Sequence, residues 1–435
     1  MTGRFVCFYS TVLLLAGAVS AQAQGPQLWS DHGSSSYEAQ APAWYTPGAT
    51  QAPTTGWQPR TPPYEAGPAN RSWDNLSGDR GWDYENTPLD EFFADVARNS
   101  YFRMEYMLHG FRNPGDELLG STILSQNDPT VPFQVTDTGG QLAGEARVAT
   151  TEDLNYPDAQ GLRATLGIPL IGGALEANIF FFDTVEDSSF IGDRGVLGEP
   201  TSGNPLDVPQ FIATSTRTNG LTGNNLLLYD DSFATDLTAD MWGSEVNFVF
   251  DAYLPEPMFQ LRPMVGFRYI NFRESLRQVG VFDQQDFLVI PLVSRINSDT
   301  ENSIFAPQIG LRAEMVSRWL TLGIEPKLAA GVNVYETSVV TQALRSPGDP
   351  RIETTSTGEE FAVVGELNAY ARIHIRQNFT VTVGYQATFI DNVTRSHSSI
   401  FYNDNGANAD AAIVTKPSFE LFDFGGLNVS GEIRF

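Results

Sequence analysis

Long stretches of strict two-residue alternation are the feature that most constrains the fold of this chain. In residues 361–376, "FAVVGELNAYARIHIR", uncharged side chains such as Phe361 and Leu367 share one parity, while Glu366 and Arg372 lie on the other. The stretches "WLTLGIEPKLAAGVNVY" and "NFTVTVGYQATFI" repeat this scheme. Because successive side chains of a β-strand point to opposite faces, each stretch predicts a strand with one uncharged and one polar face. This pattern is typical of a strand with lipid on one side and a polar lumen on the other.

A soluble sandwich also alternates, but strand length and connection length favour a membrane barrel. Several of the alternating stretches run 13 to 17 residues, whereas strands in soluble domains usually have roughly five or six. A bilayer crossing needs about 9–11 residues, so such strands can span the membrane and protrude from it. Short links are predicted at 169–173, 254–257, 317–318 and 376–378, and long polar ones at 109–159, 185–237, 275–301, 337–358 and 393–417. We therefore predict an all-β, up-and-down antiparallel transmembrane β-barrel of about ten strands, with about twelve as the alternative.

The predicted strands are 98–108, 160–169, 174–184, 238–252, 258–274, 302–317, 319–336, 359–376, 379–392 and 418–435. Residues 141–153 fit either a further strand or a hairpin within the first long loop. Pro263, Pro307 and Pro326 fall inside predicted strands, where a proline removes a ladder hydrogen bond. We expect β-bulges or strand ends at these positions.

The N-terminal part has a different composition. Residues 1–23 read as a secretory signal peptide, with Arg4, the apolar run "VLLLAGAV" and the cleavage pattern Ala21-Gln22-Ala23. Residues 24–97 are rich in Pro, Gly and Gln without apolar periodicity, which predicts a disordered periplasmic linker. Scattered tryptophans in this linker suggest the alternative of a segment that binds cell-wall polymer or a periplasmic protein. The barrel is then expected at 98–435, in the bacterial outer membrane.

Charge and cysteine content exclude several classes of protein. The chain carries 52 acidic and 26 basic residues, a formal charge of −26, whereas binding a nucleic acid backbone requires positive surface. The single cysteine, Cys7, lies in the predicted signal peptide, so no disulfide framework or thiolate site is expected in the mature chain. No cofactor is predicted.

Several segments together resemble a family of outer-membrane β-barrel proteins that is abundant and largely uncharacterised in planctomycetes. Its opening strand has the form aromatic-x-Arg-x-Glu-Tyr-x-Leu, and "YFRMEYML" places Arg103, Glu105 and Tyr106 in the matching positions. The resemblance continues through "GLRATLGIPLIGGALEANIFFF", "RPMVGFRYINF", "IFAPQIGLRAE", "GELNAYARIHI", "VTVGYQATFIDNVTR" and "FGGLNVSGEIRF". The chain departs from the family where His109-Gly110 replaces the usual tryptophan. The resemblance implies an outer-membrane barrel and transfers no catalytic residues.

The chain ends on an aromatic residue of an alternating strand. Leu427, Val429, Ile433 and Phe435 share the uncharged parity, which faces outer-membrane lipid and fits the C-terminal signal read by the barrel-assembly machinery.

The opposite parity of the predicted strands carries charges of both signs. These lumen-facing candidates are Arg103, Glu105, Arg268, Arg312, Glu314, Glu325, Lys327, Glu366, Arg372, His374, Glu432 and Arg434, with Arg163, Glu176, Glu245, Arg262 and Arg376 on the same parity. Mixed signs in a narrow barrel favour a packed or nearly packed interior, and a narrow pore is the alternative.

No catalytic or metal site is predicted. The only histidines are His32, His109, His374 and His397, and their spacing to serine or acidic residues indicates no triad. The acidic loops lack the spacing of an EF-hand and are read as solvated surface. The predicted role is therefore structural or envelope-interacting; a narrow pore for small solutes is second, and a barrel enzyme third.

Overall fold

The computed structural model describes residues 100–123, 126–136, 140, 142–192, 209–253, 258–283, 290–404 and 413–435. The predicted signal peptide, the linker and the short link at 254–257 lie outside these residues and remain predictions. Within the described ranges the regular elements are all strands. These ranges hold no helix long and apolar enough to cross a membrane.

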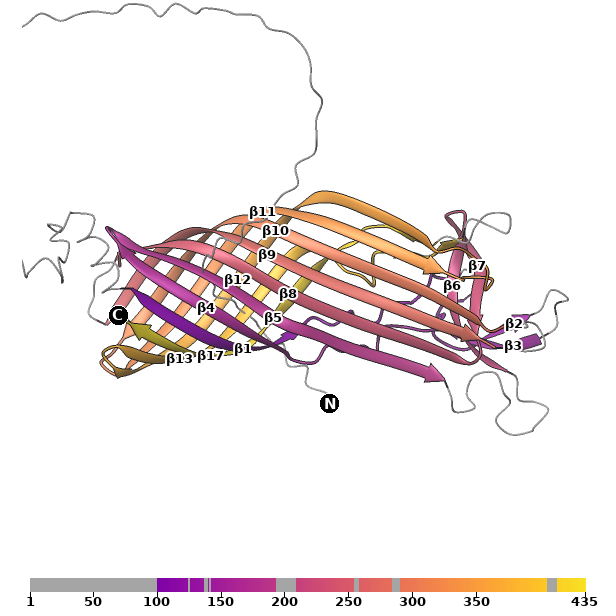
Figure 1. The fold of residues 1–435 in the computed structure, drawn as a ribbon, viewed down its shortest axis with the longest axis horizontal. Coiled ribbons are helices and arrows are strands. Elements are labelled where there is room, and N and C mark those ends of the chain that lie inside the picture. Colours follow the sequence, from indigo (N-terminus) through magenta and orange to yellow (C-terminus); the bar gives the residue numbers. More distant parts are fainter. Residues whose placement is uncertain are drawn as a thin grey trace, which may run out of the picture. The chain divides into compact units, whose positions relative to one another are not determined.

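Ten antiparallel strands form a closed barrel (Figure 1). They are β1 (Tyr101–Phe111), β4 (Ala159–Leu170), β5 (Gly173–Gly192), β8 (Ser232–Phe250), β9 (Phe259–Phe282), β10 (Leu292–Val316), β11 (Leu320–Gln342), β12 (Ile352–Arg376), β13 (Phe379–Thr394) and β17 (Phe419–Arg434). Their order around the barrel is β1-β17-β13-β12-β11-β10-β9-β8-β5-β4. Tyr101 pairs with Arg434 on β17 and with Gly167 on β4, which closes the wall. The predicted barrel of ten strands is confirmed, and the alternative of twelve is wrong.

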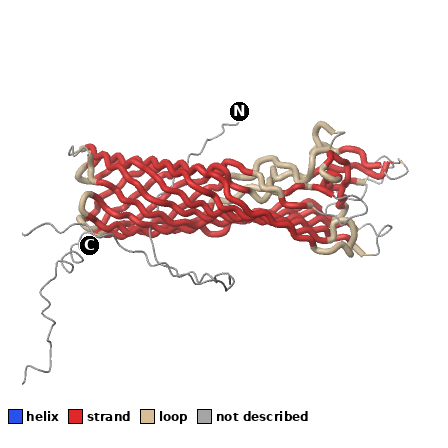
Figure 2. The backbone as a smooth tube through the Cα atoms, turned by 90° about the horizontal axis from the view of Figure 1, so that it is seen from above, coloured by secondary structure: helices blue, strands red, loops and turns tan. Residues whose placement is uncertain are grey.

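The two ends of the barrel differ in their connections. We name the end that holds the C-terminus the turn end. The described links at this end are tight. Gly172, at φ 83°, lies in the two-residue turn between β4 and β5. A positive φ of this kind is easily adopted only by glycine. The long connections lie at the opposite end, the loop end (Figure 2).

An apolar band surrounds the barrel next to the turn end. On each strand the outward row carries no charge up to one position, where a charged residue or, on β4, a glutamine appears: Arg112, Gln160, Asp183, Asp240, Arg273, Glu301, Glu336, Glu359, Asp391 and Asp423. The only other strongly polar residues below these positions in the described outward rows are Ser244, Asn271 and Ser303. In its row, each lies one place before the charge on β9 and β10 or two places before it on β8. Trp242, Tyr269 and Phe305 precede this switch on β8, β9 and β10, with ring centroids 5.0 and 4.8 Å apart. Interfacial aromatic rings above an apolar band mark the lipid boundary of a membrane barrel.

The strands continue beyond this band, which corrects the predicted loop lengths. Residues 275–301 and 337–358 were expected to be long polar loops, but β9 extends to Phe282, β10 begins at Leu292, and β11 and β12 extend similarly. β5 and β8 likewise run into the predicted loop 185–237. The prediction failed because the outward row turns polar beyond the lipid, which removes the apolar alternation although backbone pairing continues.

The loop connections fold into a second sheet. It contains β2 (Phe133–Thr136), β3 (Leu142–Val148), β6 (Gln210–Thr218), β7 (Leu221–Tyr229) and β15 (Asn403–Asp404), and Figure 1 shows β2, β3, β6 and β7 at the loop end. Two shorter strands, β14 (Ile400–Phe401) and β16 (Val414–Thr415), pair beside it. Ile123, Phe133, Ala146, Val148, Phe211 and Ala213 form its buried apolar cluster. The uncertain region 141–153 is thus part of a hairpin with β2 and adds no strand to the barrel.

The three prolines lie in strands without a register shift at their positions. Pro263 pairs with Leu311 on β10, Pro307 with Phe267 on β9, and Pro326 with Leu367 on β12. In the described pairings, each proline has a partner strand on one side only. The expected bulges are absent because the missing N–H of each proline falls on the side where the ladder opens locally, while the neighbouring residues keep the pairing on the other side.

Candidate functional site

The predicted lumen residues lie on the inward rows of the barrel strands. Glu105, Arg268, Arg312, Glu314, Glu325, Lys327, Glu366 and Glu432 are buried. The side chains of Arg103 and Arg372 are 11% and 12% exposed, and that of Arg434 is 49% exposed at the turn end. His374 is also near the turn end, where one ring nitrogen lies 2.9 Å from the hydroxyl of Thr321.

Buried ion pairs connect non-neighbouring strands inside the apolar band. Lys327 Nζ on β11 lies 3.0 Å from Glu245 Oε1 on β8 and 3.1 Å from Glu366 Oε1 on β12. Arg268 on β9 also bonds both carboxylates, 2.9 Å from Glu245 Oε2. β8 and β11 are separated by β9 and β10 in the wall, so these contacts run through the lumen. Such pairs contribute little net stability, but removing one partner leaves an uncompensated charge.

This ionic network extends toward the turn end through Arg312. Its guanidinium donates to Glu176 at 2.7 and 2.6 Å and to Glu325 at 2.5 Å, and Tyr101 donates to the same Glu176 at 2.5 Å. We define the ionic network as Glu176, Glu245, Arg268, Arg312, Glu325, Lys327 and Glu366. A vestibule of about 240 Å³ opens at the turn end, and the next cavity inward is about 20 Å³, room for about one water.

An amide layer lies deeper in the lumen. Arg163 pairs with Glu105 at 3.0 Å and donates to the side-chain oxygen of Gln386 at 2.7 Å. Asn428 donates to the same oxygen at 2.7 Å, and its own oxygen lies 2.7 Å from His109 Nε2. β4, β13, β17 and β1 therefore meet through buried polar side chains.

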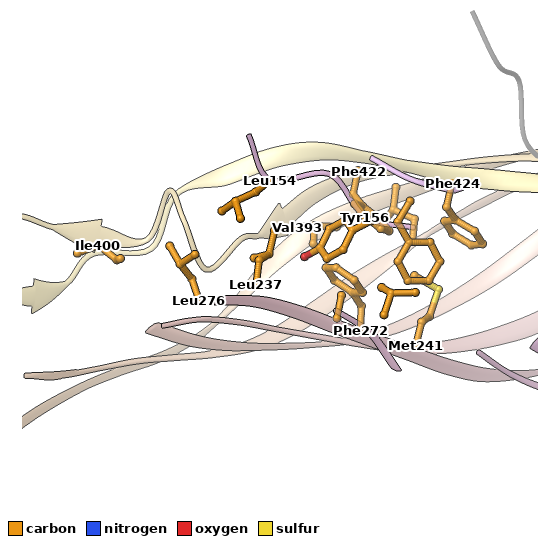
Figure 3. Packing of buried hydrophobic residues seen from close by; sticks show 14 of the residues in the cluster. Leu154, Tyr156, Leu237, Met241, Phe272, Leu276, Val393, Ile400, Phe422 and Phe424 are labelled. Atoms are coloured by element: carbon orange, nitrogen blue, oxygen red, sulfur yellow. The ribbon is translucent and has the colours of Figure 1, made fainter. Parts of the chain in front are cut away.

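A layer of aromatic rings closes the lumen at the level where the outer face turns polar. The aromatic layer consists of Phe111, Tyr156, Phe182, Phe272, Phe422 and Phe424. The ring of Phe111 is surrounded by the other five at centroid distances of 5.5 to 6.4 Å. Phe272 on β9 stacks on Phe422 on β17 with ring centroids 4.3 Å apart. Both residues are labelled in Figure 3. β9 and β17 are five strands apart in either direction around the wall, so this contact joins opposite sides of the barrel.

Beyond the aromatic layer, one buried carboxylate holds two long connections inside the barrel. Glu274 on β9 accepts hydrogen bonds from Tyr156 at 2.7 Å, from Arg395 Nε at 2.9 Å, and from Ser396 N and Oγ at 2.7 and 3.0 Å. Arg395 also lies 5.1 Å from the ring centroid of Phe422. Burial would raise the pKa of Glu274, but the Arg395 guanidinium and His397 hold it well below its usual range. We name Tyr156, Glu274, Arg395, Ser396 and His397 the Glu274 cluster.

His397 lies between two carboxylates of this region. Its ring nitrogens are 3.8 Å from Glu274 Oε2 and 3.7 Å from Glu420 Oε2. Burial lowers the pKa of an imidazole, but the two nearby carboxylates raise the pKa of His397 above its ordinary value.

Sequence reasoning missed the aromatic layer and the Glu274 cluster. Glu274 has the inward parity of a predicted strand, so the sequence could have predicted that its side chain points into the lumen. Its partners could not, because Tyr156 and Arg395 fall in stretches that were read as external loops, and both are buried.

The closed antiparallel wall, the apolar band and the polar interior define an outer-membrane β-barrel protein. The model of the family described as "Putative beta barrel porin-7 (BBP7)" matches residues 101–435, and the chain belongs to this family. The expected membership of an outer-membrane β-barrel family is therefore confirmed.

Three of the solved structures that align with the chain are the following. The outer membrane protease OmpT from Escherichia coli aligns at 12% identity and TM-score 0.40, covering 78% of this chain and 98% of that one. The P. putida toluene transporter TodX aligns at 7% identity and TM-score 0.19, covering 80% and 92%. A Pseudomonas aeruginosa FadL homologue aligns at 9% and 0.20, covering 80% and 94%. These likenesses carry no argument about activity. None of the curated proteins compared with the chain matches it.

Proposed function

We propose that this protein is a sealed barrel that anchors a folded loop-end sheet in the bacterial outer membrane, with a structural or envelope-interacting role and no catalytic reaction. The turn end with the chain terminus faces the periplasm, and the loop end faces the exterior. The observation that carries the proposal is the stacking of Phe272 on Phe422 across the full width of the barrel.

This contact argues against a resting pore for a physical reason. Conduction requires a continuous column of water, whereas rings from opposite walls at 4.3 Å leave no room for water between them. The ionic network and the Glu274 cluster fill the lumen on the two sides of this layer. A permeating ion would have to separate buried pairs on its way, at the cost of several kcal/mol that breaking such a pair entails.

The test is single-channel recording on the refolded mature chain in planar bilayers. The wild-type protein should be silent. The double variant Phe272→Ala/Phe422→Ala, which leaves only the polar layers to block the lumen, should show brief conducting events. Phe248→Ala/Phe250→Ala is the matched control, because these rings also touch, at 4.9 Å, but Phe250 is exposed on the outward face. Steady conductance of the wild-type barrel would refute the proposal.

A gated narrow pore is the second candidate. It is favoured by the family description and by the turn-end vestibule, which has several arginines in its lining: Arg103, Arg262, Arg312, Arg372 and Arg434. Opening would require the two connections held by Glu274 to leave the lumen. A wild-type barrel that is silent at rest but conducts under an applied stimulus would support this candidate.

The proposal also assigns roles to the C-terminal strand and to the predicted linker. Leu427, Val429, Ile433 and Phe435 are exposed on the outward row, at 48% to 64%, next to β1. We propose that they contact lipid and serve as the recognition strand for the barrel-assembly machinery. The predicted linker at 24–97, outside the described residues, would bind cell-wall polymer or a periplasmic protein.

A further inference from the structure

A separate cavity of about 460 Å³ lies at the loop end. Its wall comes from the first long connection (116–122), from Arg217 on β6, from residues 397–402 and from the start of β17. The ionic network, the amide layer and the aromatic layer do not line this cavity. Of the Glu274 cluster, only His397 lines it.

Carboxylates outnumber cations in the cavity wall. Asp116, Glu117 and Glu420 line it together with Arg217. Within the described residues Asp116 and Glu117 have no ion-pair partner, although the backbone of Glu117 is held by hydrogen bonds of 2.9 and 3.0 Å to and from Thr151. The two carboxylates are thus presented by an ordered backbone with their charges uncompensated.

Buried polar atoms in the same wall lack hydrogen-bond partners. Within the described residues the hydroxyl of Ser121, which is 6% exposed, has no hydrogen-bond partner. His397 is 4% exposed, and its ring nitrogens come no closer than 3.7 and 3.8 Å to the carboxylates of Glu420 and Glu274, beyond hydrogen-bond distance. Buried groups of this kind are rare in native proteins unless a water or a ligand completes them. This observation is independent of the carboxylates and points to a ligand with hydrogen-bonding groups.

One part of the wall is apolar, although Thr122, Ser398 and Ser418 also line the cavity. Leu118, Ile400 and Tyr402 line the cavity, and the last two are 8% and 5% exposed. A volume of about 460 Å³ exceeds what a bare ion needs, and the combination of one apolar stretch of wall with uncompensated carboxylates suits a cation with a short hydrocarbon chain.

We propose that this cavity binds a primary alkylammonium group, as carried by a free diamine or by the lysine side chain of a peptide. An ammonium has three donors and no acceptor, which matches Glu420 and the Asp116–Glu117 pair. Its alkyl chain lies along Leu118 and Ile400. The proposal is independent of whether the lumen conducts.

The test is calorimetric titration of the refolded mature chain in detergent with n-butylammonium, 1,5-diaminopentane and N-acetyl-lysine-amide. n-Butanol serves as the uncharged analogue. We expect saturable binding of the amines and none of butanol. The tighter of the diamine and the lysine derivative identifies the natural source.

Variants assign the binding to this cavity. Glu420→Gln should weaken amine binding about ten-fold or more, as expected for the loss of a charge-assisted hydrogen bond. Asp116→Asn/Glu117→Gln changes exposed side chains that do not support the fold. It should weaken amine binding, while the change in gel migration on boiling, which reports a folded barrel, stays as in the wild type. Asp158→Asn is the matched control, because Asp158 is an exposed acid of the same connection outside the cavity lining. Equal binding of amine and butanol, binding of Ca²⁺ or a neutral sugar in place of amines, or unchanged affinity in both variants would overturn the proposal.

Discussion

Replacing Glu274 with alanine should release the two connections that fill the loop end of the lumen. Glu274 and Arg395 are both fully buried, and the Arg395 guanidinium lies 2.7 Å from the carboxylate. Without the carboxylate, the contacts of the Arg395 guanidinium that remain are its hydrogen bond to the Arg112 carbonyl at 3.1 Å and its position over the ring of Phe422. Breaking a buried pair by removing one member costs about 3–5 kcal/mol. Because about 1.4 kcal/mol changes an equilibrium ten-fold, the closed arrangement should weaken by roughly two to three and a half orders of magnitude.

Trypsin provides the assay, because Arg395 is itself a cleavage site that is inaccessible in the closed state. Limited digestion followed by mass spectrometry should show cleavage after Arg395 much faster in Glu274→Ala than in the wild type. Glu301→Ala is the matched control. Its partner Arg273 is 53% exposed, so its loss should cost less than about 1 kcal/mol and leave Arg395 protected.

A double variant separates the lost pair from general disruption. Glu274→Leu/Arg395→Met removes both charges at once and, with Arg395, the tryptic site, so it is compared with Glu274→Ala by chymotrypsin cleavage after Tyr402, which is buried in the same connection. It should recover most of the protection, since replacing a buried pair by apolar residues is often neutral. If Arg395 is cleaved no faster in Glu274→Ala than in the wild type, the reasoning that assigns closure to this carboxylate is refuted.

Three further predictions concern the other layers and the response to pH. Phe422→Ala should lower the free energy of unfolding by about 3–5 kcal/mol, measured by urea titration in lipid, because it removes a buried ring that touches the opposite wall. Lys327→Met should cost a similar amount, about 3–5 kcal/mol, because Glu245 and Glu366 lose a shared cation; a loss below about 1 kcal/mol would contradict the network. The pKa of His397 is raised in the fold, so protonation of its imidazole stabilises the folded state. This stabilisation is complete below the unfolded-state pKa of about 6.5 and is lost as the pH rises through the higher pKa of the folded state. The stability difference between wild type and His397→Gln should therefore be largest in mildly acidic solution and vanish in alkaline solution, and a difference that grows with pH would refute the assignment.

Much of the barrel could be predicted from the alternation alone. Each predicted barrel strand has one observed counterpart, and the uncharged row of 427–435 lies outward while Glu432 lies inward. Side-chain parity is a local property of extended backbone, so it can be read without knowledge of the rest of the chain. The lengths of β9 to β12 could not be read in this way, because beyond the lipid both faces of these strands carry polar residues.

The amino-acid sequence by itself determined the strand count, the face of each strand that meets lipid, and the mixed charges of the lumen. The tertiary structure alone decided which inward side chains meet. Phe272 reaches Phe422, and Glu274 reaches Tyr156 and Arg395, only because closure of the wall places β9 opposite β17 and leads the long connections back inside. Such contacts depend on the order and stagger of all ten strands, which no single strand encodes.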